Sequence, residues 1–224
     1  MKDLESYWSS RTNSESELIE QGILLSRENQ ALKIELQKQK LELEELDSLR
    51  KLTNLPKVRG YRYETARVAK RDLTSWWQEI TIDKGEDYGI NKNAPVVFSR
   101  GVVGKIKEVH SNTSVVTLIT SRNFRMAARF LEDQRPVTYI GSINASFRKP
   151  KGIVRDAPSD ITVSSENPQI LVSSDLGSIF PAGIKIGEVH FMEPGTNGLF
   201  KTGQVLLHPD LLYIHEVSVL LPYK

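Results

Sequence analysis

Residues 79–106 read EITIDKGEDYGINKNAPVVFSRGVVGKI in one-letter code. Short runs rich in Val, Ile and Thr alternate here with turn-forming residues: the run 79–82 precedes Gly85, and the run 95–98 precedes Gly101. Short apolar runs bounded by Gly, Pro, Asn and Asp are typical of β-strands joined by tight turns. The stretch therefore predicts β structure at the centre of the chain.

The same pattern continues from this stretch to the C-terminus. Apolar or alternating runs predict further strands at 102–109, 114–120, 124–131, 138–145, 152–154, 161–163, 169–172, 184–192, 201–207 and 216–221. Many short strands at even spacing are typical of an all-β sandwich or barrel. Two sets of about six strands predict a mainly β head of two small six-stranded β-barrel subdomains, over residues 56–135 and 136–224.

Residues 1–55 have a different composition. No proline precedes Pro56, and the strong helix formers Leu, Glu, Gln and Lys dominate. Two series of residues spaced by seven form a heptad pattern that Gln39 and Arg50 interrupt. The pattern predicts a long α-helix that forms a coiled-coil dimer through Leu18, Leu25, Asn29, Leu32, Leu36, Leu43 and Leu46. Asn29 falls at an a position, where a polar residue fixes the register at some cost in stability.

The length of this helix favours pairing with a second copy. At 1.5 Å per residue, a helix of about 36 residues extends about 54 Å, which is longer than a head of this size could cover. The alternative is a single amphipathic helix that packs against its own domain.

Composition argues against several classes of protein. Thirty Lys and Arg against 28 Asp and Glu give a net charge of +2, and residues 1–17 are acidic on balance, so nothing indicates a nucleic-acid partner. The chain has no cysteine, which removes disulfides and thiolate metal sites. None of the four histidines has metal-ligand spacing, and no GxSxG motif surrounds Ser173 or Ser174. We therefore expect no catalytic, metal-binding or cofactor-binding residues.

Residues 29–222 resemble the MreC family of rod shape-determining proteins. The resemblance to the family's first β domain is carried by Trp76, Trp77, Asp83, Gly85, Gly89, Pro95, Gly101 and Gly104. The resemblance to its second domain is carried by Phe180, Pro181, Gly183 and Gly187. We expect these residues to be structural, with the two tryptophans on opposite faces of a strand and the glycines of the first set in positive-φ turns. Asp175 stands where the family usually has glycine, so we expect the turn after Ser174 to be built differently.

The resemblance implies a non-enzymatic scaffold of the cell-wall elongation machinery that maintains rod cell shape. It implies a homodimer without a cofactor, whose β head binds a class B penicillin-binding transpeptidase and works with MreD, RodA and MreB. It also implies a location on the extracytoplasmic or periplasmic face of the inner membrane, with an N-terminal membrane helix that this sequence lacks. No run of about 18 apolar residues occurs, and the N-terminus lacks the apolar region of a signal peptide.

Two alternatives remain open at this point. Two six-stranded barrels also describe the chymotrypsin-like serine peptidases, and the absence of a membrane segment fits a soluble coiled-coil adaptor in the cytosol. A predicted loop adds a basic cluster of Arg148, Lys149, Lys151 and Arg155. It is either a solvated loop or an electrostatic contact for an acidic partner or an anionic wall polymer.

Overall fold

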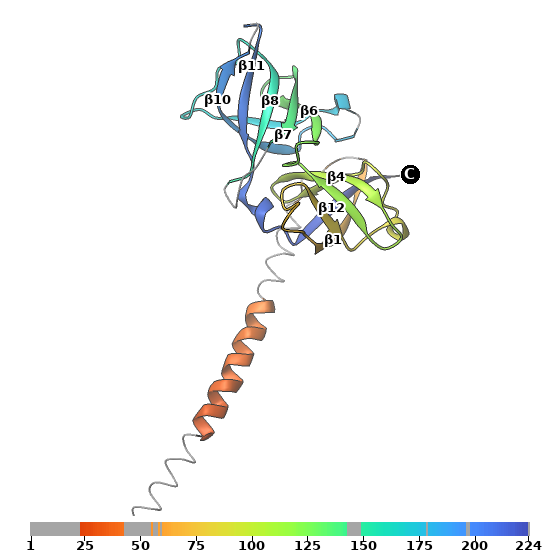
Figure 1. Cartoon of the computed structure of the whole chain (residues 1–224), viewed down its shortest axis with the longest axis vertical. Helices are drawn as coiled ribbons and strands as arrows, with labels where there is room; N and C mark the ends of the chain where they lie inside the picture. Colours follow the sequence, from red (N-terminus) through yellow and green to blue (C-terminus); the bar gives the residue numbers. More distant parts are fainter. Residues whose placement is uncertain are drawn as a thin grey trace, which may run out of the picture. The chain divides into compact units, whose positions relative to one another are not determined.

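The computed structural model describes residues 23–42, 55, 58, 60–142, 149–177, 179–195 and 198–223. The chain divides into two units, Met1–Arg50 and Lys51–Lys224. Figure 1 shows a helix in the first unit and β-strands in the second. This is the fold class that the sequence predicts.

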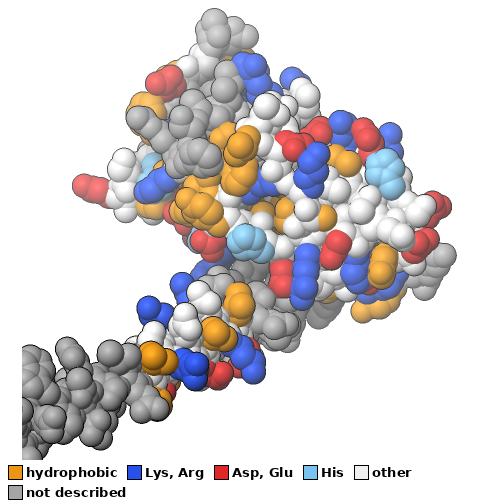
Figure 2. All heavy atoms as spheres, turned by 60° about the horizontal axis from the view of Figure 1, so that its bottom comes forward, with side chains coloured by type: hydrophobic (Ala, Val, Ile, Leu, Met, Phe, Trp, Pro, Cys, Tyr) orange, Lys and Arg blue, Asp and Glu red, His pale blue; other side chains and the backbone are white. Residues whose placement is uncertain are grey.

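The first unit contains an uninterrupted α-helix over residues 23–42, in which every side chain is exposed. Leu25, Asn29, Leu32 and Leu36 lie on this helix, whereas Leu18, Leu43 and Leu46 lie outside the described residues. Figure 2 shows apolar side chains on the surface of this helix, between basic and acidic ones. The exposed apolar residues of the helix, with half to two thirds of each accessible, are Ile23, Leu24, Leu25, Leu32, Ile34, Leu36 and Leu41.

The second unit contains two closed antiparallel barrels of six strands each. The first barrel consists of β1 (Tyr61–Lys70), β2 (Glu79–Ile82), β3 (Pro95–Phe98), β4 (Gly101–Val109), β5 (Ser114–Leu118) and β12 (Glu216–Pro222), in the order β1-β12-β3-β4-β5-β2. The second consists of β6 (Arg125–Phe130), β7 (Pro136–Gly141), β8 (Lys151–Pro158), β9 (Gln169–Ser173), β10 (Lys185–Pro194) and β11 (Phe200–Leu206), in the order β10-β11-β8-β7-β6-β9. Three short 3-10 helices, η1 (Glu86–Tyr88), η2 (Asp175–Gly177) and η3 (Pro209–Leu212), complete the elements.

The expected division into 56–135 and 136–224 is wrong, because the second barrel is inserted into the first. Strand β12 pairs with β1 from Arg67↔Glu216 to Tyr61↔Pro222, and it also pairs with β3. Figure 1 shows β12, in blue, among the yellow and green strands of the first barrel. Strand β6, expected in the first barrel, pairs with β7 and β9 of the second. Alternating runs mark where strands are, but the pairing that closes a barrel joins residues about 150 positions apart and leaves no local pattern.

The two barrels share one hydrophobic core cluster. The Tyr139 hydroxyl of β7 is fully buried and donates a hydrogen bond to the carbonyl of Ile119, just after β5, at 3.1 Å. Burial raises the pKa of this phenol well above its usual value. The ammonium group of Lys105, on β4 of the first barrel, lies 5.9 Å from the centre of the Phe124 ring, just before β6 of the second barrel. Residues of both barrels therefore stabilise the junction.

Gly101 lies at this junction. Its φ is 139°, and a Cβ at this position would collide with the backbone carbonyl of Lys185 in the other barrel. The expected positive φ is confirmed at Gly101 and at Gly89, where it is 76°. It is wrong at Gly85, whose φ is −140°, and at Gly104, which has no positive φ. A Cβ at Gly85 would collide with the carbonyl of His110, so close approach of the backbone explains that residue.

Trp76 and Trp77 lie in a turn before β2 and not, as expected, on a strand. The amides of residues 78 and 79 both bond to the Ser75 carbonyl, which places both half-buried tryptophans within the turn. Arg71 stacks its guanidinium 4.3 Å from the centre of the Trp76 ring and donates two hydrogen bonds to the Trp76 carbonyl. It also donates to the last two carbonyls of η3. Burial lowers the pKa of Arg71 to about 10, so it stays charged at neutral pH.

The expected strand at 161–163 does not form, since Ile161 donates its amide to the carbonyl of Pro158 in a turn.

Asp83 pairs with Arg67 of β1. The Asp83 carboxylate accepts from the Arg67 amide, and the Asp83 amide donates to the Arg67 carbonyl, which fixes the end of β2 against β1. Phe180 is buried, whereas Gly183 has a φ of 88° in open space. Pro95 begins β3 and is buried, and Gly187 packs closely against the carbonyl of Leu206.

Candidate functional site: a hollow on the second barrel

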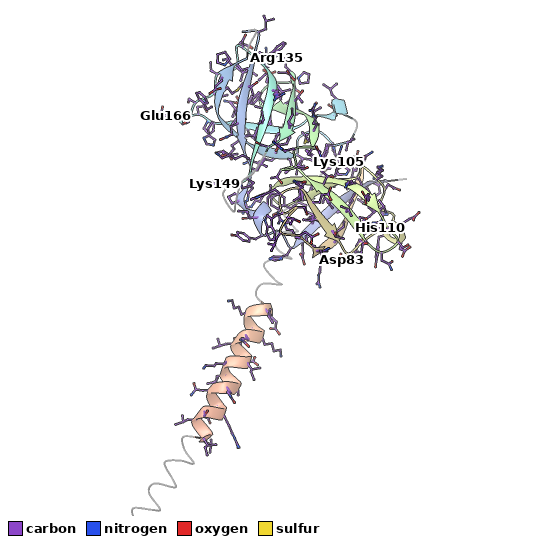
Figure 3. The ribbon with its side chains drawn as sticks, in the orientation of Figure 1. Asp83, Lys105, His110, Arg135, Lys149 and Glu166 are labelled. Carbon is purple, nitrogen blue, oxygen red and sulfur yellow. The ribbon has the colours of Figure 1, made fainter. Side chains whose placement is uncertain are left out.

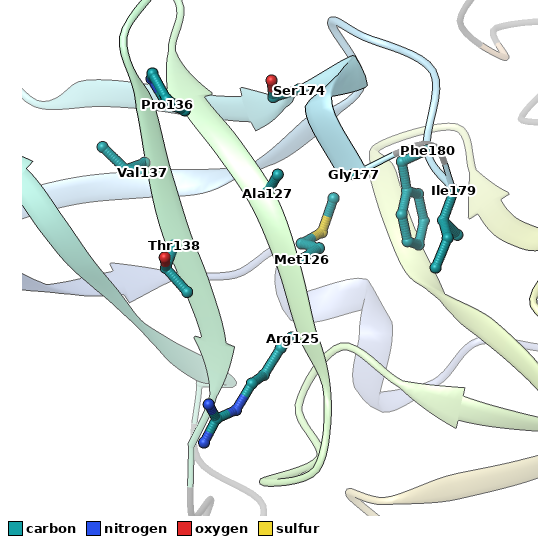
Figure 4. A pocket seen from close by; sticks show the side chains of 10 residues that line it. All are labelled: Arg125, Met126, Ala127, Pro136, Val137, Thr138, Ser174, Gly177, Ile179 and Phe180. Atoms are coloured by element: carbon teal, nitrogen blue, oxygen red, sulfur yellow. The ribbon is translucent and has the colours of Figure 1, made fainter.

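A hollow of about 450 Å³ lies beside β6, β7 and η2 of the second barrel. Figure 4 shows the side chains that surround it. It is lined by Arg125, Met126, Ala127, Pro136, Val137, Thr138, Ser174, Gly177, Ile179 and Phe180. Six of these ten are apolar, and the volume falls within the range of pockets that bind small ligands or peptide side chains.

The pairing of two strands forms the wall of this hollow. Ala127 of β6 lies opposite Thr138 of β7, and the two half-buried side chains face outward. Their neighbours Met126 and Val137 are buried because successive side chains of a strand alternate between the two faces. The amide of Ser174 donates to the carbonyl of Ala127 at 3.1 Å, so η2 begins against β6.

Arg125 is the one charged residue among the described residues that line the hollow. It is exposed at the start of β6, and within the described ranges no carboxylate pairs with it. Two other arginines nearby in sequence already have partners. Arg129 donates to the carbonyls of Phe130 and Leu131, and Arg135, labelled in Figure 3, lies between Asp133 and Asp160.

The structure places part of the basic cluster near this hollow. Arg148 lies outside the described residues, and Lys149, labelled in Figure 3, is exposed just before β8. Lys151 and Arg155 lie on β8 itself, so the prediction of one loop is wrong for them. The register pairs Arg155 with Thr138, which puts it one strand away from the wall of the hollow.

The hollow and Arg125 were missed by sequence reasoning. A signal for the arginine exists, since Arg125, Ala127 and Arg129 alternate with Met126 and Ala128 in a short strand. This alternation predicts an outward basic edge on β6. The hollow depends on the packing of η2 and residues 179–180 against that strand, which no local pattern encodes.

Ser173 has a structural role. It is fully buried, its hydroxyl bonds to the carbonyl of Pro181, and its oxygen accepts from the amide of Ile184 at 2.9 Å. A serine nucleophile needs a base within hydrogen-bond reach, and no described hydrogen bond joins Ser173 to a histidine or a carboxylate. The geometry gives no support to the serine peptidase alternative.

The turn after Ser174 is a 3-10 helix. Asp175 begins η2 and is exposed, and the hydroxyl oxygen of Ser174 accepts from the amide of Leu176 at 3.4 Å.

Within the described part of the chain, no group of His, Asp or Glu side chains could hold a metal ion. No helix in that part is long and apolar enough to cross a membrane.

The family model described as rod shape-determining protein MreC, barrel core, matches residues 68–221. This chain belongs to the MreC family. The matched residues run from β1 to β12 and so include both barrels and the inserted topology.

Curated MreC relatives extend the match beyond the barrels. The cell shape-determining protein MreC of Bacillus subtilis is 31% identical over 192 residues, which cover 81% of this chain and 64% of the relative. That of Listeria monocytogenes is 29% identical over 183 residues, which cover 80% of this chain and 60% of the relative. The chain thus spans less than two thirds of the length of these relatives.

Solved MreC structures have the same fold. One matches with a TM-score of 0.71 at 22% identity, covering 80% of this chain and 98% of that one. MreC from Listeria monocytogenes matches with a TM-score of 0.65 at 25% identity, covering 90% and 95%. A complex between Penicillin-Binding Protein (PBP2) and MreC from Helicobacter pylori has a matching chain with a TM-score of 0.54 at 13% identity, covering 71% and 98%.

Proposed function

We propose that this chain is a non-enzymatic scaffold of the cell-wall elongation machinery, which pairs through its helix and binds a peptidoglycan-synthesis enzyme through its β head. The observation that carries the proposal is the combination of an exposed, leucine-rich helix over residues 23–42 with the two closed barrels of the MreC family. A helix that exposes so much apolar surface gains stability by burying it against a partner.

The partner that we propose for the head is a class B penicillin-binding transpeptidase. The support comes from the Helicobacter pylori complex, in which MreC is bound to PBP2. MreD, RodA and MreB are further proposed members of the assembly. The proposed location is the extracytoplasmic face of the inner membrane, where the family resemblance implies an N-terminal membrane anchor.

A binding measurement tests the proposed function. The whole chain is immobilised, and the class B transpeptidase of the same cell is passed over it in a biolayer interferometer. We expect saturable binding that is unchanged when penicillin has acylated the transpeptidase, because a scaffold does not use the catalytic serine of its partner. A low-molecular-weight penicillin-binding carboxypeptidase of that cell is the control. Equal signals from both enzymes, or none from either, would contradict the proposed function.

A further inference from the structure

We propose that the hollow beside β6, β7 and η2 holds an extended acidic segment of a protein partner, with an aliphatic side chain in the hollow and a carboxylate on Arg125. The inference deepens the scaffold function proposed above and rests on it. It names the part of the head that binds and the chemistry of what is bound.

The shape and lining of the hollow favour an aliphatic side chain. A volume of about 450 Å³ is larger than one side chain and fits a short extended segment. Pro136, Ile179 and Phe180 provide apolar atoms of the lining, and the small side chain of Ala127 leaves space beside them. Burying an aliphatic group here removes apolar surface of both partners from water.

The charge at the hollow favours a carboxylate. Arg125 has no acidic partner among the described residues, and Arg155 lies on the same outer face two strands away. A guanidinium binds a carboxylate through two parallel hydrogen bonds, which fixes both position and orientation. Asp175 is exposed on η2, and Figure 4 shows Arg125 at the opposite end of the hollow from Ser174 and the start of η2. The acidic end of the bound segment therefore lies at Arg125.

The combination favours a peptide over a wall polymer. A polyol phosphate chain would satisfy Arg125 but offers no side chain for the apolar lining. An extended peptide in which leucine and glutamate stand two positions apart carries both on the same face and satisfies both. The Thr138 hydroxyl in that wall adds a group that can bond to a peptide backbone.

The three methionines of the chain allow a direct test. Met126 lines the hollow, Met192 lies on β10 of the same barrel, and Met1 is the N-terminal residue. In the whole chain labelled with 13C at the methionine methyl groups, each residue gives one NMR signal. The probes are a nonapeptide in which leucine and glutamate alternate at every second position with serine between them, its counterpart with glutamine in place of glutamate, and a short poly(glycerol phosphate). We expect the acidic peptide to shift the Met126 signal in a saturable way, while Met192 stays in place.

Two variants and a matched control define the site. Arg125→Gln should weaken binding of the acidic peptide about tenfold, because a charge-assisted pair is lost. Thr138→Phe should block the hollow while Arg125 is kept, and its aromatic side chain suits a strand. Arg122→Gln removes the same charge three residues away, at an exposed position outside the lining, and should bind as the unchanged chain does. Added salt should weaken binding to the unchanged chain more than to Arg125→Gln.

The outcomes separate this inference from the proposed function. A transpeptidase that binds the unchanged chain should bind Arg125→Gln and Thr138→Phe more weakly and Arg122→Gln equally well. If all three variants bind it equally and Met126 does not respond to the peptide, the hollow is not the site, and the scaffold function still stands. A Met126 shift with poly(glycerol phosphate) alone would also overturn the inference, in favour of a polyanion. If the transpeptidase does not bind but Met126 shifts with the acidic peptide, the proposed function fails and the hollow remains a peptide site.

Discussion

Gly101 is the residue at which the sequence of one barrel is constrained by the backbone of the other. Its positive φ could be predicted, because glycine between two apolar runs indicates a turn. The contact with Lys185 could not be predicted, since it joins strands β4 and β10 across the junction. Two separate constraints therefore act at this single position.

Comparing two alanine substitutions separates these constraints. Gly183→Ala places a Cβ in open space at positive φ and should cost about 1 kcal/mol of unfolding free energy. Gly101→Ala adds a collision with backbone and should cost about 3 kcal/mol. The expected decreases in melting temperature are roughly 2–4 °C and 6–12 °C. Partner binding should fall in parallel with stability for Gly101→Ala, and loss of binding with an unchanged melting temperature would place Gly101 in the interface itself.

Among the elements, the helix over residues 23–42 is the one that the sequence predicts best. The structure of a single chain leaves the apolar side chains of this helix exposed, and the proposed pairing with a second copy would bury them. Heptads are readable because the pattern is local. Trp76 and Trp77 could not be placed from the sequence. An aromatic pair beside an apolar run predicts a strand, but hydrogen bonds to the Ser75 carbonyl close a turn there.

Charges in the heptad seam should prevent pairing. Replacing Leu32 and Leu36 together with glutamate should give a monomer in sedimentation equilibrium, because the charges would be buried between two helices. Ile34 and Leu41 supply the matched control: both are about equally exposed in the single chain, and both fall outside the a and d positions. Glutamate at those two positions should leave a dimer. If the two double variants have the same mass, the seam is not the interface.

Asn29 tests the register of the pair. In the single chain its amide donates to the carbonyl of Leu25 at 3.0 Å, one turn earlier. Asn29→Leu should raise the melting temperature of the helix and allow more than one oligomeric state, because a polar a residue trades stability for specificity. A less stable variant that remains a uniform dimer would show that Asn29 lies outside the seam.

The molecule as a whole is organised by the insertion of one barrel into another. Strand positions were largely predictable, and so was the number of barrels, because both follow from short apolar runs and their spacing. The pairing partners of β6 and β12 could not be predicted. The hollow beside β6, β7 and η2 depends on the pairing of β6. The candidate site is thus built from pairing that only the folded chain reveals.

Removing the last strand tests the insertion. Deletion of residues 216–224 should unfold the first barrel, because β1 loses the seven-residue ladder between Tyr61 and Arg67. Trp76 should then become exposed, since Arg71 would no longer hold its turn against η3. Deletion of residues 223–224 alone removes the hydrogen bond from the Tyr223 amide to the Gly60 carbonyl but leaves β12 intact, so the first barrel should stay folded. The readouts are tryptophan emission and limited proteolysis, and native emission from the longer deletion would contradict the assigned topology.

The insertion also sets an order for folding during synthesis. Residues 125–206 supply every strand of the second barrel, so that barrel has all its parts before the chain is finished. Strand β1 is made earlier, yet it has to wait with an unpaired edge until β12 leaves the ribosome. The first barrel is therefore completed last. A chain that stops short of residue 216 contains a complete second barrel and an open first barrel. Such unfinished chains are the ones that quality control in the cell has to recognise.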